Sequence, residues 1–392
     1  MTIIILGDAF SFPKGEASTN RVYAYAKGLI ENNVSVHVVC LDNEYMVNYN
    51  GIIDSIRYYH PFGQTKRSSL FIIRRWHKFL KYFKASVLVR EINKKEKVKV
   101  IYLYTHIFST QFYAFVLAKF VKANLIIERC EHPLRHYNED GFKKFYGNLK
   151  LYVEMRLYDG IFCISNYLID FYKKRGFNYR KLFLVPSTVD TGRFRNNLNS
   201  PLPYDYIMYC GGLTVLKDGV HILIESFTKI SEKYPEINLV LIGKGDSIED
   251  DIMFEDYVAT LNMKGRIIFL GQLPRTDIPK YLTNAKILAL ARPQSIVSDA
   301  GFPSKLTEYL ATGKPVVVTS VGDIPVYLED NKNAFLSKPD SVDAFADKLD
   351  YVLSNYEFAQ QVGEKGKELT ETIFNYNFQA KRIIDFIDKN YN

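Results

Sequence analysis

Cysteine is scarce in this chain, and the positions of the few that occur limit what they can do. The four cysteines are widely spaced, each in or beside an apolar run, and no two have the spacing of a metal site. This pattern favours reduced core thiols in a reducing compartment. The four are Cys40, Cys130, Cys163 and Cys210.

Long hydrophobic runs are also absent. No run reaches the ~20 apolar residues that span a bilayer, and the start, MTIIILGD, enters a short strand without the charged and cleavable segments of a secretion signal. We therefore expect a cytosolic protein. With 392 residues, of which 47% are apolar and 24% charged, the chain has the composition of a soluble globular protein and the length of two or three domains.

Acidic residues are under-represented in the first half of the chain. Residues 1–199 carry 31 Lys and Arg against 16 Asp and Glu, a net charge of +15, whereas the remainder carries 20 against 27, a net charge of −7. Most of the excess lies in residues 66–99, with 12 basic and 2 acidic side chains. We expect this half to meet an anionic surface. No recognised nucleic-acid motif accompanies the charge, so we expect no nucleic-acid partner.

The basic segment contains the run FIIRRWHKFLKYFK. In a helix Trp76, Phe79, Leu80 and Phe83 share one face, and basic side chains flank it. This is typical of an interfacial helix on anionic lipid, which predicts contact with an anionic membrane surface through residues 66–99. The alternative is a domain helix whose aromatic face is core and whose lysines are solvated.

Apolar runs of strand length alternate with helical patterns along the whole chain, which predicts an α/β fold with two doubly wound parallel sheets. We expect domains at 1–199 and 200–374, joined by the polar, proline-containing hinge 195–205. The loop after the first strand, Gly7–Thr19, is not G-x-G-x-x-G, so its spacing does not predict a nicotinamide site. The predicted strands are 3–6, 34–40, 98–104, 125–128, 160–164, 182–185, 206–210, 238–242, 267–270, 287–291 and 316–318.

One stretch, Lys286–Ser320, concentrates the functional signals. A buried strand precedes a polar loop at Gln294–Phe302, a short amphipathic helix at Pro303–Thr312, and a further strand after Gly313. The loop lies at the carboxyl ends of the strands. In open α/β sheets ligands bind at that edge.

Two charges in this helix oppose local preference. Lys305 lies in the first turn, where the helix dipole disfavours a cation unless an anion, which we interpret as a phosphate, sits between them. Glu308 accepts hydrogen bonds only, so it could bind both hydroxyls of a ribose. The alternative is that Lys305 and Glu308 form a solvated i, i+3 pair.

The run GFPSKLTEYLATGKPVV, residues 301–317, resembles the signature of retaining glycosyltransferases of family 4, in a branch common in bacterial surface-polysaccharide synthesis. The resemblance covers nearly the whole chain and is weakest between Asp42 and Val98. It implies the GT-B fold, two Rossmann-like domains facing across a cleft. The second would bind a nucleotide sugar and the first the acceptor.

The resemblance also assigns residues. Glu308 matches the second of the family's two glutamates, which holds the nucleotide ribose. The first is missing, because Ala300 occupies its place; the neighbouring Asp299 is a candidate substitute. The other residues that we predict to bind the donor are Gly15, Glu16, Gly212, Lys217, Gly243, Arg292, Gly301, Phe302, Pro303, Ser304 and Lys305.

A second departure concerns the donor diphosphate. The family has an arginine followed five residues later by a lysine; Lys217 matches the lysine, but Gly212 occupies the arginine's place. We hypothesise that Arg292, at a strand's carboxyl end, replaces it, so that Lys217 and Arg292 neutralise the leaving β-phosphate. A helix-capping or interdomain salt-bridge role for Arg292 is the alternative.

The third predicted catalytic residue is a histidine. His132 precedes Pro133, which favours an extended loop conformation, and the family places a histidine after the equivalent strand, near the donor sugar. His106 is the less favoured candidate. The family also folds its last helix, here within 375–392, back onto the first domain.

These observations predict a glycosyltransferase that retains anomeric configuration, with a lipid-linked glycan acceptor at the inner membrane face. No D-x-D triplet occurs, so we expect no metal, with lysine, arginine and a helix N-terminus supplying its electrostatic role. Two alternatives remain: a sugar-nucleotide epimerase of the same fold, and a non-catalytic partner of another transferase.

Overall fold

A computed structural model describes the chain except residues 16, 43–47, 65–67, 135–140, 195–198 and 392. The chain forms two compact units: unit 1 is Met1–Thr188 with Tyr376–Asn392, and unit 2 is Val189–Asn375. Residues 195–198 of the predicted hinge lie outside the described residues, and its remainder lies in unit 2.

Unit 1 is built on an eight-stranded sheet of order β3-β4-β2-β1-β5-β6-β7-β8. All neighbouring strands are parallel except β3 and β4, which form an antiparallel hairpin at the sheet edge. The strands are β1 (Thr2–Gly7), β2 (Ser35–Cys40), β3 (Asn50–Ile53), β4 (Ile56–Tyr59), β5 (Val98–Tyr104), β6 (Asn124–Arg129), β7 (Gly160–Cys163) and β8 (Leu182–Leu184).

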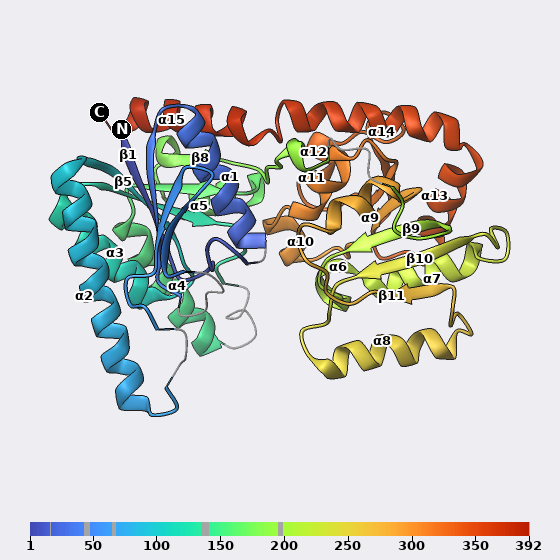
Figure 1. Ribbon diagram of the computed structural model, residues 1–392, viewed down its shortest axis with the longest axis horizontal. Helices are drawn as coiled ribbons and strands as arrows, with labels where there is room; N and C mark the ends of the chain where they lie inside the picture. Colours follow the sequence, from blue (N-terminus) through green and yellow to red (C-terminus); the bar gives the residue numbers. More distant parts are fainter. Residues whose placement is uncertain (16, 43–47, 65–67, 135–140, 195–198, 392) are drawn as a thin grey trace. The chain divides into compact units, whose positions relative to one another are not determined.

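Unit 2 has a six-stranded, fully parallel sheet of order β11-β10-β9-β12-β13-β14. The predicted α/β class with two doubly wound parallel sheets is confirmed (Figure 1). The strands are β9 (Asp205–Cys210), β10 (Ile237–Ile242), β11 (Ile267–Phe269), β12 (Ile287–Leu290), β13 (Val316–Thr319) and β14 (Phe335–Ser337).

Helices join successive strands in both units, as parallel pairing requires. In unit 1 they are α1 (Ala17–Glu31), α2 (Phe71–Lys95), α3 (Phe108–Val121), α4 (Gly141–Leu157), α5 (Asn166–Lys174), the 3-10 turn η1 (Tyr179–Lys181) and α15 (Tyr376–Asn390). In unit 2 they are η2 (Thr191–Phe194), α6 (Val215–Asp218), α7 (Val220–Ile230), α8 (Ile248–Thr260), α9 (Ile278–Asn284), α10 (Ile296–Ala300), α11 (Ser304–Ala311), α12 (Ile324–Tyr327), α13 (Val342–Ser354) and α14 (Tyr356–Glu371).

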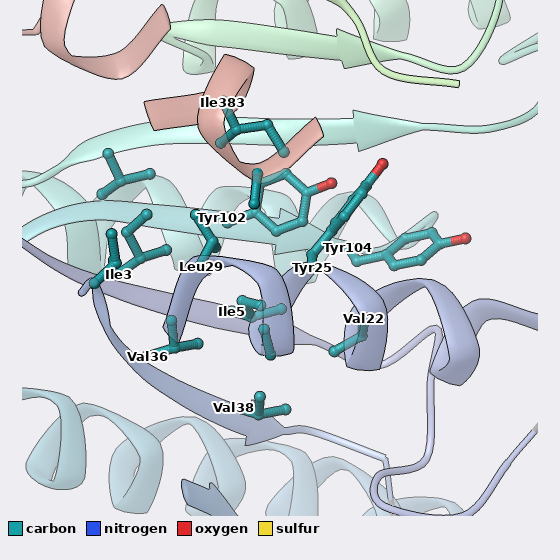
Figure 2. Packing of buried hydrophobic residues seen from close by; sticks show 14 of the residues in the cluster. Ile3, Ile5, Val22, Tyr25, Leu29, Val36, Val38, Tyr102, Tyr104 and Ile383 are labelled. Atoms are coloured by element: carbon teal, nitrogen blue, oxygen red, sulfur yellow. The ribbon is translucent and has the colours of Figure 1, made fainter. Parts of the chain in front are cut away.

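The last helix, α15, belongs to the core of unit 1. Figure 2 shows Ile383 of α15 above Tyr25, Leu29 and Tyr102, in the apolar layer between the sheet and α1. The two helices approach closely because α1 carries Gly28, where an added Cβ would lie 2.8 Å from the Ala380 Cβ. The last helix therefore completes the covering of this face of the sheet.

The outer helices of unit 1 leave large apolar side chains in solvent. The buried residues of α2 are Ala85, Val89 and Ile92, all in its second half. Trp76, Phe79 and Phe83 are 58, 59 and 59% exposed. The alternative interpretation of these three aromatic side chains as core is therefore wrong. In the described part of the chain, no helix is long and apolar enough to cross a membrane.

The sequence missed or misplaced some local structure. The β3–β4 hairpin was not predicted; its turn places Asp54 and Ser55 at positive φ, a conformation common in two-residue hairpin turns. The predicted loop at 294–302 contains α10, capped by the Ser295 side chain. The helix predicted from Pro303 begins at Ser304, because Pro303 is the extended N-cap residue.

Candidate functional site

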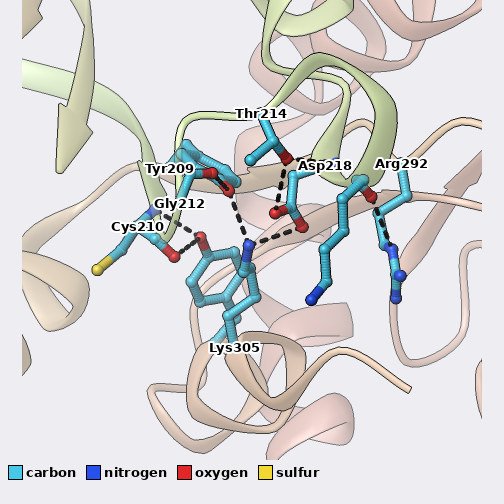
Figure 3. A network of polar contacts seen from close by, with 9 residues as sticks. Tyr209, Cys210, Gly212, Thr214, Asp218, Arg292 and Lys305 are labelled. Atoms are coloured by element: carbon cyan, nitrogen blue, oxygen red, sulfur yellow. Dashed lines mark hydrogen bonds and ion pairs between the residues drawn. The ribbon is translucent and has the colours of Figure 1, made fainter. Parts of the chain in front are cut away.

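The carboxyl edge of the sheet in unit 2 carries a polar network, shown in Figure 3. Its centre is Lys305 in the first turn of α11. The Lys305 Nζ lies 2.7 Å from Asp218 Oδ1 and 2.7 Å from the Tyr209 hydroxyl. Lys305 and Glu308 therefore do not form the solvated pair considered as an alternative, because each has a different partner.

The partner of Glu308 is Arg193 of η2. An Arg193 Nη1 to Glu308 Oε1 distance of 2.5 Å defines the ion pair, and Arg193 Nη2 donates to the Arg275 carbonyl at 3.3 Å. Both partners are partly exposed, so the Glu308 carboxylate remains accessible for a ligand hydroxyl.

Glycines shape the loops around the Lys305 ammonium. A Cβ at Gly211 would overlap the Lys305 Nζ, and a Cβ at Gly243, which has φ +139°, would overlap the Gly211 carbonyl. Close backbone approach therefore requires glycine at Gly243. At Gly212 an added Cβ meets nothing nearer than 3.8 Å, so sterics do not explain why arginine is missing there.

Arg292 lies at the end of β12 and is 3% exposed. Its Nε donates to the Lys217 carbonyl at the end of α6 at 3.3 Å. This single bond is the helix-capping role that the sequence analysis gave as the alternative for Arg292. Its Nη1 and Nη2 make no hydrogen bond with the residues that the structure describes. Burial lowers the pKa of Arg292, and Asp218 only partly offsets this. A buried guanidinium with unused donors is suited to an anion.

The loop before α11 has a mainly structural role. Gly301 caps α10, and its N–H donates to the Val297 carbonyl at 3.1 Å. Phe302 is buried against the rings of Tyr327 and Phe374. The structure therefore places Phe302 in the core of unit 2 and Pro303 with Ser304 at the start of α11.

The suggested substitute for the missing glutamate is held locally. Asp299 Oδ1 accepts a hydrogen bond from Gln294 Nε2 at 2.7 Å, and Ala300 is fully buried. Among the described residues, no hydrogen bond or ion pair joins Asp299 to the Arg292 side chain.

The predicted residues of unit 1 lie after β1 and β6. His132 is buried beside the rings of Tyr167 and Phe171. Its Nδ1 accepts from the Leu134 N–H at 3.2 Å, which places the proton of the neutral ring on Nε2. Burial, with a contribution from Arg175, lowers the pKa of His132 to about 4. The ring is therefore a neutral donor near pH 7.

The remaining unit 1 candidates are less defined. Gly15 lies against Thr19, whose hydroxyl a Cβ at Gly15 would overlap. Glu16 lies outside the described residues. The less favoured His106 is exposed, with its ring 6.4 Å from that of Tyr104.

Comparison with known proteins finds matches to the part of the chain that contains this network. Residues 190–369 match the family model "Glycosyl transferases group 1". An uncharacterized glycosyltransferase of Methanocaldococcus jannaschii is 26% identical over 192 residues, which are 49% of this chain and 47% of that protein. The match spans about half the length of this curated relative. Residues 190–369 are therefore similar to group 1 glycosyl transferases.

Solved structures extend the likeness of fold to the whole chain. Sucrose-phosphate synthase from Thermosynechococcus elongatus has a TM-score of 0.74 at 17% identity, over 99% of both chains. HepE of Anabaena, solved in complex with UDP, has a TM-score of 0.69 at 14% identity, over 99% of this chain and 100% of that one. The chain therefore has the GT-B fold of these glycosyltransferases.

The region that matches the family model contains three polar partners that the sequence analysis missed: Tyr209, Asp218 and Arg193. Asp218 directly follows Lys217, a predicted donor-binding residue. This adjacency could have marked Asp218 as a further site candidate. Arg193 gives no such signal, because it is 115 residues from Glu308.

The remaining question about the site is whether its residues could hold a metal ion. Among the described residues, no three His, Cys, Asp or Glu side chains are grouped to hold a metal ion. Transfer without a metal remains a prediction.

Proposed function

We propose that this protein is a glycosyltransferase that moves a sugar from a nucleotide-sugar donor to a glycan acceptor with retention at the anomeric carbon. The observation that carries the proposal is Arg292, buried at the strand edge of unit 2 with two Nη atoms unused by the described residues. Lys217 and Lys305 belong to the same network. This concentration of positive charge suits a donor diphosphate.

The proposed donor contacts follow from this charge. The diphosphate would accept from Lys217, Arg292 and Lys305, and Glu308 would accept the ribose hydroxyls. A uridine nucleotide is the first candidate, since HepE was solved with UDP.

The proposed transfer is electrostatic in character. The bond from the anomeric carbon to the β-phosphate oxygen breaks, and its electron pair stays on that oxygen, where Lys217 and Arg292 stabilise the charge. The acceptor oxygen bonds the same carbon on the same face, and its proton passes to the departing phosphate. His132, neutral with its proton on Nε2, would donate to a donor-sugar hydroxyl.

Product analysis tests this function. The protein is incubated with UDP-glucose and a panel of other nucleotide sugars, with a bacterial glycolipid extract as acceptor, and NMR reports the anomeric configuration. We expect one donor to be consumed with retention, and Arg292→Ala to slow this at least tenfold. Lys332→Ala, an exposed cation of the same unit, is the control. An isomerised donor without acceptor would instead support the epimerase.

A non-catalytic partner remains the second candidate, favoured by one observation. Ala300 is fully buried where the family has a glutamate, so that carboxylate is missing. Nucleotide binding without turnover of any donor would support it.

We further propose that the acceptor is lipid-linked, in synthesis of a bacterial surface polysaccharide at the inner membrane face. The supporting observation is the outer surface of unit 1, where α2, α3 and α4 carry 13 basic and 2 acidic residues. Exposed apolar side chains accompany this charge, as in interfacial helices on anionic lipid. On α3 and α4 they are Phe108, Phe112, Val116, Phe120, Phe142, Phe145, Tyr146, Leu149, Tyr152 and Val153.

The single tryptophan provides a built-in test. Trp76 is the only tryptophan of the chain and lies on the exposed part of α2. We expect vesicles with 30% phosphatidylglycerol to shift its emission to shorter wavelength and brominated acyl chains to quench it, with phosphatidylcholine alone as control. An unchanged spectrum with anionic vesicles would contradict membrane contact through α2.

A further inference from the structure

Asp218 is a buried carboxylate at the end of α6, and only 5% of it is exposed. Its Oδ1 lies 2.7 Å from the Lys305 Nζ, and its Oδ2 accepts from the Thr214 hydroxyl at 3.3 Å. The backbone N–H of Asp218 donates to the same Thr214 oxygen at 3.1 Å. The carboxylate is therefore fixed on its own helix before it meets the lysine of α11.

The Lys305 ammonium is confined on its other sides. It donates to the Tyr209 hydroxyl, which itself donates to the Gly212 carbonyl at 2.6 Å, and lies 4.7 Å from the Tyr209 ring centroid. An ammonium has three N–H donors. Among the described residues, hydrogen-bonding acceptors occupy two: Asp218 and Tyr209. The third is available to a ligand oxygen.

The charges around Lys305 explain why a carboxylate is needed. The groups that face it are Asp218 on α6, Tyr209 and Cys210 on β9, and Arg292 after β12. Burial lowers the pKa of Lys305 and Arg292 adds to this, whereas Asp218 opposes both. Asp218 itself also faces Arg292 and Lys217. In this poorly solvated site, beside the Arg292 guanidinium, the Lys305 ammonium would lose its proton more readily without a counter-charge.

We propose that Asp218 is a positioning residue that holds the Lys305 ammonium charged and directs its third N–H toward a phosphate oxygen of the ligand. The ligand class, a nucleoside diphosphate, rests on the proposed function. The coupling of Asp218 to Lys305 does not, so it can be tested without any ligand.

The first experiment measures the protonation of Lys305 directly. Brief acetylation with acetic anhydride between pH 6 and 11, read at Lys305 by peptide mass spectrometry, follows the uncharged amine. Asp218→Asn should move the midpoint at least one pH unit lower, and Asp205→Asn, which removes the partner of the partly exposed Lys286, should not move it. Asp218→Ser gives the same comparison should the asparagine variant fail to fold. An unchanged midpoint in the folded variant would overturn the proposal.

The second experiment measures UDP binding by calorimetry at pH 6.5 and 9. For Asp218→Asn we expect affinity equal to wild type or tighter at pH 6.5, where Lys305 stays charged and one repulsive carboxylate is gone. At pH 9 we expect binding at least tenfold weaker than wild type. A role in folding alone would weaken binding equally at both values and would overturn the proposal. Failure of the wild type to bind UDP would count against uridine as the base, while the acetylation midpoint would still decide the role of Asp218.

Discussion

Arg21 of unit 1 and Arg292 of unit 2 are both buried, and their side chains are hydrogen-bonded in opposite ways. Arg21 of unit 1 makes four hydrogen bonds of 2.7 to 3.0 Å, two to Glu128 Oε1 and one each to the Val185 and Pro186 carbonyls. Arg292 of unit 2 makes one side-chain hydrogen bond, at 3.3 Å, with the described residues. The Arg21 guanidinium is hydrogen-bonded within unit 1. The Nη donors of Arg292, in contrast, are not used by the described residues.

The electrostatics of the two arginines differ accordingly. Burial alone would lower the pKa of Arg21, but Glu128 together with Tyr25, Cys130 and Tyr104 outweighs it, so the pKa is raised. Burial lowers the pKa of Arg292, and Asp218 is shared with Lys305 and does not restore it. We therefore predict that Arg21 serves the stability of unit 1 and that Arg292 serves ligand binding in unit 2.

The largest expected effect is a loss of stability in unit 1 when the ion pair between Arg21 and Glu128 is broken. Arg21→Met leaves the Glu128 carboxylate buried without its cation, which costs about 3–5 kcal/mol in comparable buried pairs. We expect unit 1 to lose that much free energy of unfolding, measured by hydrogen exchange at the amides of β6, while those of unit 2 are unaffected. Adding Glu128→Gln should recover most of the loss. Equal destabilisation of single and double variants would contradict the electrostatic explanation.

A smaller effect is expected at Arg292, and it concerns ligand affinity more than stability. Arg292→Met removes one long hydrogen bond, so the ligand-free protein should change in free energy of unfolding by no more than about 1 kcal/mol. UDP binding should weaken by about 2 kcal/mol, roughly thirtyfold, because a charged donor is lost. Calorimetry of UDP binding and urea unfolding of the same preparation measure the affinity and the free energy of unfolding separately. Loss of stability without loss of affinity would make Arg292 as structural as Arg21.

The smallest effect concerns pH. His132 has a native pKa of about 4, below the ordinary value of about 6.5, so the unfolded chain binds its proton first as pH falls. The contribution of His132 to stability is complete above pH 6.5 and is lost as pH falls toward 4. His132→Asn, whose amide oxygen can replace Nδ1 as acceptor for Leu134, should reduce the loss of stability between pH 7.5 and 5 in urea unfolding. Identical pH dependence in variant and wild type would contradict this.

The sequence predicted the regular elements well because their signals are local. Apolar runs bounded by glycine and proline define most of the predicted strands. The β3–β4 hairpin escaped because its turn residues, Asp54 and Ser55, carry no glycine to mark positive φ.

The partners of the predicted site residues could not be obtained in this way. Glu308 and Lys305 drew attention through their places on one helix, but Arg193 and Asp218 reach them through the tertiary fold. The amphipathic pattern of α2 likewise shows that one face is apolar without showing which face packs. Only the structure shows that Trp76, Phe79 and Phe83 are left in solvent.

Thermal unfolding with uridine, guanosine and adenosine nucleotide sugars tests whether unit 2 binds a nucleotide sugar through α11. Ligand at ~100 times Kd should stabilise the protein by about 2.7 kcal/mol. We expect one base to give this shift, Glu308→Ala to abolish it, and Glu329→Ala, an exposed glutamate of the same unit, to preserve it. No shift with any nucleotide sugar, or a full shift in Glu308→Ala, would contradict the account.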